Sequence, residues 1–126
     1  MPAPIVRLET RKRCLRAGEG LFPCRSEAPF RFLARLWWQH TRQPAQPWVT
    51  VDELGMCLGT ATHPRQLLRT VDWLEKTGLG LIAFETRTRG RYRLACEADR
   101  LRPDLGSAAL GRWLGLDEAG GEAEEA

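Results

Sequence analysis

The sequence predicts an α+β fold in which short antiparallel strands come before and after a group of helices. Three observations support this class. Apolar and polar residues alternate over residues 5–24, which is typical of a half-buried sheet with a turn at AGEG. Apolar residues then recur at helical spacing between residues 27 and 77. Alternation returns over residues 81–96 on both sides of a turn, which indicates a β-hairpin.

Length and composition favour one domain with loose ends. The chain has 126 residues, 43% of them hydrophobic, and its five tryptophans argue against a wholly disordered protein. No apolar run approaches twenty residues, so we expect no membrane partner, and the first residues lack the pattern of a secretory signal, which favours a cytoplasmic protein. We expect a domain over 1–100, a segment with weak helical character over 101–116, and a flexible acidic tail over 117–126.

The inventory of chemically active residues favours neither catalysis nor metal binding. Cysteines stand at positions 14, 24, 57 and 96, and no two of them have the spacing of a zinc ribbon or a redox motif. Packed, reduced thiols are the simplest interpretation, with structural zinc or disulfides as the alternative. The chain also lacks a glycine-rich phosphate loop. We therefore expect no enzyme, no catalytic residue, no metal and no cofactor.

The net charge of +3 conceals an uneven distribution. The last ten residues hold five acids and no base, so residues 1–116 carry 19 bases against 11 acids. A basic body of this kind indicates a polyanionic partner, although a merely solvated basic surface is the alternative.

A first helix is predicted over residues 27–40. Ser26 offers a side-chain oxygen to free backbone amides, and Pro29 lies in the first turn, where its missing N–H is harmless. The apolar residues that follow recur at helical spacing, namely Phe30, Leu33, Ala34 and Trp37. Two prolines within residues 41–47 end this pattern, so that stretch is expected to form a loop.

Two further helices follow the loop, one short and one longer. Thr50 and Glu53 have the spacing of a capping box, which predicts a short helix near 52–58. The longer helix is expected over 64–77, because a proline at its start suits the first turn and Gly78 suits the left-handed position after a helix end.

The longer helix has two chemically different faces at 100° per residue. Its apolar side consists of Leu67, Val71 and Leu74. The opposite side carries Arg65, Arg69, Asp72 and Lys76, with Trp73 at its margin. The first side should pack in the core, which leaves the second free to contact a partner. The alternative is an ordinary solvent-facing side on which Arg65 or Arg69 pairs with Asp72 or with Trp73.

The hairpin carries an arginine at every second position: Arg87, Arg89, Arg91 and Arg93. Because side chains alternate along a strand, the last two should face solvent while Tyr92 and Leu94 join the core. The first two lie at the tip, where they can reach a phosphate backbone or a minor groove. The alternative is an edge strand whose charges discourage aggregation.

This order of elements predicts a winged helix-turn-helix, with the short helix as brace, the 64–77 helix as reader of the major groove and the 81–96 hairpin as wing. We therefore expect a sequence-selective protein that binds double-stranded DNA, a transcriptional regulator. Arginine can pair with guanine and glutamine with adenine, whereas Lys76 should contact phosphate. The predicted DNA-binding residues are His63, Arg65, Gln66, Arg69, Lys76, Arg87, Arg89, Arg91 and Arg93.

The stretch from Ile5 to Cys96, about three quarters of the chain, resembles the effector domain of OmpR-type response regulators. The resemblance lies in PFRFLARLWW as the first helix, VTVDEL at the start of the second, RQLLRTVDWLEK as the reader and RGRYRL as the closing strand. It implies binding of direct or inverted DNA repeats by a dimer, so a homodimer is a further expectation.

A second hypothesis treats the domain as a protein-interaction module within a larger assembly or a longer protein, without DNA binding. Trp73 on the third helix and Trp113 near the C-terminus motivate it, since exposed aromatic residues often anchor protein contacts.

Overall fold

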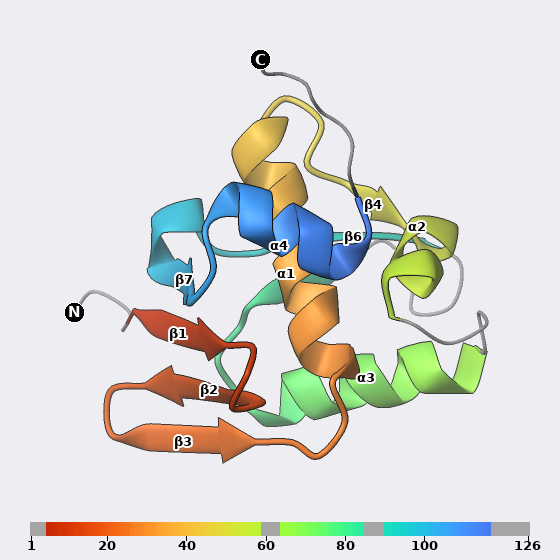
Figure 1. Ribbon diagram of the computed structural model, residues 1–126. Helices are drawn as coiled ribbons and strands as arrows, with labels where there is room; N and C mark the ends of the chain where they lie inside the picture. Colours follow the sequence, from red (N-terminus) through yellow and green to blue (C-terminus); the bar gives the residue numbers. More distant parts are fainter. Residues whose placement is uncertain (1–4, 59–63, 85–89, 117–126) are drawn as a thin grey trace.

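The computed structural model describes residues 5–58, 64–84 and 90–116. Over these ranges the chain is mixed α+β, with four α-helices and two sheets, which confirms the predicted class. No helix of the described ranges combines the length and the apolar character that crossing a membrane requires. Helix α1 (Ala28–Arg42) runs through the middle of the molecule, with the larger sheet beside it (Figure 1).

The larger sheet has the strand order β3-β2-β1-β7. Strands β1 (Val6–Glu9), β2 (Cys14–Ala17) and β3 (Gly20–Pro23) are antiparallel neighbours, as the alternation of residues 5–24 predicts. Gly18 lies in the turn between β2 and β3 with φ 58°, a conformation that favours glycine. Val6, Leu8 and Leu15 are fully buried on the inner side of this sheet.

The segment after residue 97 contains a helix, as its composition predicts, but also a 3₁₀ turn and a strand that the sequence did not indicate. A 3₁₀ turn (Ala98–Arg100) leads into strand β7 (Leu101–Pro103), which pairs parallel with β1, and helix α4 (Ser107–Leu114) follows. Pro103 is tolerated in β7 because the strand lies at the edge of the sheet, where one side needs no backbone donor. Leu101, Leu110 and Leu114 of this segment lie in the same hydrophobic cluster as α1.

The three predicted helices are present with small shifts at their ends. Helix α1 extends to Arg42, and the Ser26 hydroxyl accepts a hydrogen bond from the Ala28 amide at 3.1 Å. Helix α2 (Val51–Cys57) begins with the predicted capping box of Thr50 and Glu53. Helix α3 (Pro64–Lys76) ends before Gly78, whose φ is 71°.

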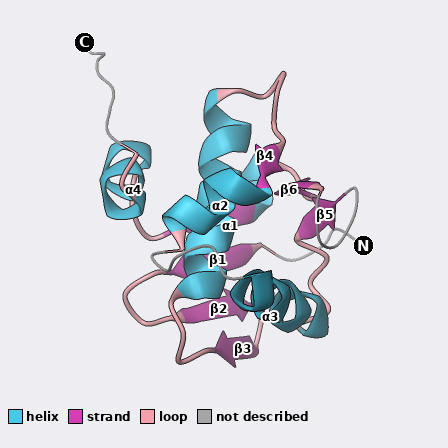
Figure 2. Cartoon of the chain, turned by 90° about the vertical axis from the view of Figure 1, so that its right-hand side faces the viewer, coloured by secondary structure: helices cyan, strands magenta, loops and turns pink. Residues whose placement is uncertain are grey.

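The smaller sheet is built around the predicted hairpin. Strands β5 (Ile82–Phe84) and β6 (Arg91–Leu94) pair antiparallel, and β6 also pairs with a two-residue strand, β4 (Val49–Thr50), that precedes α2. Its strand order is therefore β4-β6-β5. Seen in Figure 2, this sheet and α3 lie on the same side of α1.

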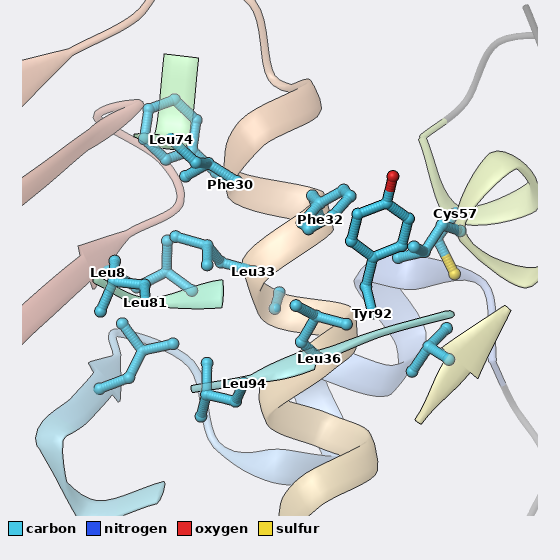
Figure 3. Packing of buried hydrophobic residues seen from close by; sticks show 14 of the residues in the cluster. Leu8, Phe30, Phe32, Leu33, Leu36, Cys57, Leu74, Leu81, Tyr92 and Leu94 are labelled. Carbon is cyan, nitrogen blue, oxygen red and sulfur yellow. The ribbon is translucent and has the colours of Figure 1, made fainter. Parts of the chain in front are cut away.

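One hydrophobic cluster joins both sheets to the helices (Figure 3). The four largest hydrophobic side chains that helix α1 buries in this cluster are Phe30, Phe32, Leu33 and Leu36. The rings of Phe32 and of Tyr92 on β6 pack in a T-shaped arrangement, with 5.3 Å between ring centres. Because such clusters supply most of the folding free energy, the orientation of α3 and β6 follows from how their apolar sides pack on α1.

Candidate nucleic-acid interface

Helix α3 has one buried and one exposed side, as its sequence predicts. Leu67, Val71 and Leu74 are at most 6% exposed, and they pack in the central cluster. Arg65, Arg69, Asp72 and Lys76 are exposed, and Gln66 is half-buried. The apolar side faces the protein because burying it removes its surface from water, and this fixes the charged side toward solvent.

The cations of α3 take no part in the ion pairs formed within the described residues. Those pairs join Arg13 and Arg31 to Glu27, Arg16 to Glu9, and Arg35 to Glu53. Within the described residues, Arg65 and Arg69 form no ion pair with Asp72 and do not stack on Trp73. Among the described residues, the guanidinium groups of Arg65 and Arg69 therefore have no acidic or aromatic partner.

The alternation predicted for β6 is confirmed. Tyr92 is fully buried and Leu94 is 1% exposed, whereas Arg91 is exposed and Arg93 is half-buried on the opposite side. Both guanidinium groups lie over the ring of Trp48, with 5.2 Å from Arg91 and 5.6 Å from Arg93 to the ring centre. The outer side of the small sheet therefore presents two cations supported by one aromatic ring.

Trp48 is the residue of this surface that the sequence did not indicate. It directly precedes β4, and Val49 of that strand is fully buried opposite Tyr92. Alternation therefore turns Trp48 to the outer side, where the two arginines lie. The sequence offered one signal, the segment WVT in a chain that also contains an arginine-rich strand. A strand as short as the two residues of β4 shows no period of 2, so this signal does not identify the strand.

Arg35 connects α1 to the start of α2. Arg35 is 5% exposed. Its guanidinium lies 3.6 Å from the Glu53 carboxylate and donates a 2.9 Å hydrogen bond to the side-chain oxygen of Gln39. The same Glu53 carboxylate accepts the Thr50 backbone amide at 2.9 Å as part of the capping box. The helix that precedes α3 is thus fixed to α1 through one shared carboxylate.

The two tryptophans of the protein-interaction hypothesis are both half-buried. Trp73 meets the Phe30 ring edge-on, with 5.7 Å between ring centres. Trp113 on α4 lies beneath the Arg31 guanidinium, 4.7 Å from its ring centre. Each tryptophan therefore packs against α1, which gives both of them a role in holding elements together.

Three predicted DNA-binding residues, His63, Arg87 and Arg89, lie outside the described residues. Over the ranges that are described, no group of three or more His, Cys, Asp or Glu side chains is arranged to hold a metal ion. Comparisons of the chain with protein-family models, curated proteins and solved structures found no match.

Proposed function

We propose that the chain is a winged helix that binds double-stranded DNA sequence-selectively and acts as a transcriptional regulator. The arrangement of elements supports this proposal: α2 and α3 follow α1, and the β5–β6 hairpin follows α3 and pairs with β4. In this proposal α3 reads the major groove, α2 braces it, and the hairpin is the wing.

The exposed side of α3 is the observation that carries the proposal. Thirteen residues form this helix, which makes it about 20 Å long at 1.5 Å per residue. Its apolar side is buried in the core, which fixes the helix in place, and Arg65 and Arg69 extend from the opposite side into solvent. The major groove of DNA is wide enough to admit an α-helix, and arginine can donate two hydrogen bonds to guanine there.

The supporting contacts come from Lys76 and from the outer side of β6. A lysine at the last turn of a reader helix is suited to phosphate rather than to base edges. Arg91 and Arg93 share the ring of Trp48, which restricts their rotamers before binding and lowers the entropy lost on contact with phosphates. The tip residues Arg87 and Arg89 extend this contact in the proposal.

Selection of bound duplexes from a random pool at moderate salt tests the proposal. We expect an enriched motif, and two half-sites related by symmetry or repetition would accompany a homodimer. Arg65→Ala or Arg69→Ala should then cost about 1–3 kcal/mol of binding and relax the preferred base at one position. Arg112→Ala, which removes an exposed arginine of α4, is the matched control. A pool without enrichment, or equal losses for Arg65→Ala and Arg112→Ala, would contradict sequence-selective binding.

A further inference from the structure

The solvent side of the four-stranded sheet carries a row of three arginines. Arg7 on β1 lies opposite Arg16 on β2 and opposite Arg102 on β7 in the strand register. All three are exposed, while their strand neighbours Val6, Leu8 and Leu15 are buried on the other side. We call Arg7, Arg16 and Arg102 the arginine row.

The arginine row is electrostatically costly for the isolated protein. Like charges placed directly opposite each other on neighbouring strands destabilise a sheet. One carboxylate partly offsets this repulsion, since Glu9 lies 3.5 Å from Arg16. Arg102 donates through its Nε to the Asp99 carbonyl oxygen at 3.3 Å, and its terminal nitrogens form no ion pair within the part of the chain that the structure describes. Arg11 and Lys12, exposed in the turn between β1 and β2, add to the positive potential.

Large apolar side chains lie on the same side of the sheet as the arginine row. Leu21 on β3 is 53% exposed and continues the row, because it lies opposite Arg16. Ile5 is 44% exposed and comes two residues before Arg7, which places it on the same side by alternation. Together with Met56 on α2, they are the large hydrophobic residues exposed within the described ranges.

We propose that this sheet side binds an acidic amphipathic helix of a partner protein. Neighbouring strands are about 4.8 Å apart, so the arginine row spans about 10 Å across the sheet. Carboxylates at positions i, i+4 and i+7 of a helix span about 10.5 Å along its axis, which matches that length. Arginine binds carboxylates in a bidentate geometry, and Ile5 and Leu21 receive the apolar residues of the helix.

Apolar residues beside the arginines favour a protein partner over a nucleic acid. A phosphate backbone has no apolar surface against which Ile5 and Leu21 could be buried, whereas protein interfaces combine arginine with apolar contacts. This inference uses neither α3 nor β6, so it stands independently of the proposed DNA binding.

The test is a selection from a phage-displayed library of helical peptides of about sixteen residues, which is enough for four turns. The full-length protein is the target, and an Arg7→Ala, Arg102→Ala double variant is the counter-target. We expect enrichment of peptides with Asp or Glu at helical spacing beside Leu or Ile. A synthetic copy of a selected peptide should bind at least about tenfold more weakly to the double variant, which corresponds to 1.4 kcal/mol.

Three controls make each outcome informative. Arg112→Ala should leave peptide binding unchanged, Leu21→Ser should weaken it, and thermal unfolding should show that every variant folds. Enrichment of neutral or basic peptides, or equal binding by the double variant, would overturn the proposal. If the double variant instead loses affinity for duplex DNA, the arginine row contacts nucleic acid, which also overturns it. DNA binding that depends on Arg65 and not on Arg7 leaves both proposals standing.

Discussion

The guanidinium carbon of Arg91 lies 5.2 Å from the centre of the Trp48 ring. The two residues are brought together by the pairing of β4 with β6, in which Thr50 lies opposite Arg91. A surface arginine is ordinarily free to sample many rotamers, and stacking on an indole restricts it. The same ring also supports Arg93, so one tryptophan orients two cations of the proposed wing.

Replacing Trp48 should weaken DNA binding without changing base preference. Ordering one rotamer-rich side chain on binding costs about 0.5–1.5 kcal/mol, so we expect Trp48→Ala, which removes the restriction on both arginines, to lose about 1 kcal/mol of binding, or roughly fivefold in affinity. Fluorescence anisotropy with a labelled duplex measures this loss. Trp48→Phe keeps an aromatic face and should retain most of the affinity. Equal affinity for the wild type and Trp48→Ala would show that the stacking does not serve DNA binding.

Lys76 should contribute to affinity but not to specificity. Because it lies in the last turn of α3, we expect Lys76→Ala to weaken binding to all duplexes alike and to reduce the salt slope by about 0.9. Titrations of a selected and a scrambled duplex at several salt concentrations measure both effects. A change in the preferred sequence would place Lys76 at base edges instead of the backbone.

The contact between Thr10 and Asp104 should be essential for the attachment of β7. The Thr10 hydroxyl donates to the Asp104 carboxylate at 2.7 Å and its amide donates at 3.1 Å, while the Asp104 amide donates to the Leu8 carbonyl oxygen. Thr10 is 3% exposed, so Asp104→Ala leaves two shielded donors without a partner. We expect a loss of about 2 kcal/mol in the free energy of unfolding.

Urea unfolding measures this loss, and Glu97→Ala is a suitable control. Glu97 is exposed and its side chain forms no capping hydrogen bond to the 3₁₀ turn that follows. An Asp104→Ala protein that unfolds at the wild-type urea midpoint would show that β7 is held by its backbone pairing and by Leu101 alone.

Three buried thiols should make the fold sensitive to alkaline pH. Burial raises the pKa of Cys14, Cys57 and Cys96, and for Cys14 a hydrogen bond with the Glu9 carboxylate raises it further. At a pH between the thiol pKa of the unfolded state and the higher pKa of the native state, the native state binds more protons than the unfolded state. The contribution of these thiols to the free energy of unfolding is therefore complete below about pH 9 and decreases above it.

Unfolding titrations from pH 7 to pH 10, together with alkylation followed by mass spectrometry, test this expectation. At pH 8 iodoacetamide should modify Cys24, which is half-buried, before the three buried thiols, and urea should remove the difference. Equal rates for all four cysteines in the folded protein would contradict it.

Sequence patterns predicted the elements whose signals are local. The capping box of Thr50 and Glu53 and the glycine after α3 each depend on a few neighbouring residues. The buried and exposed sides of α3 and of β6 follow from a period of 3.6 or of 2 along a single element. These elements could therefore be placed without knowing the rest of the fold.

The elements that escaped prediction depend on partners far away in the sequence. Strand β7 has three residues and exists because Leu101 pairs with Val6, and β4 has two residues and exists because Val49 pairs with Tyr92. Neither strand is long enough to show a period. The position of Trp48 under two arginines and the alignment of the arginine row across three strands follow from these pairings, so neither was predictable from spacing alone.

The most direct test of the proposed function is the salt dependence of duplex DNA binding. Lys76, Arg91 and Arg93 provide three phosphate contacts in our proposal, so the logarithm of the association constant should fall with the logarithm of salt concentration with a slope of about −3 or steeper. Anisotropy titrations between low and physiological salt measure this slope. An affinity that stays constant over that range, or no binding at low salt, would contradict the proposal that this chain binds DNA.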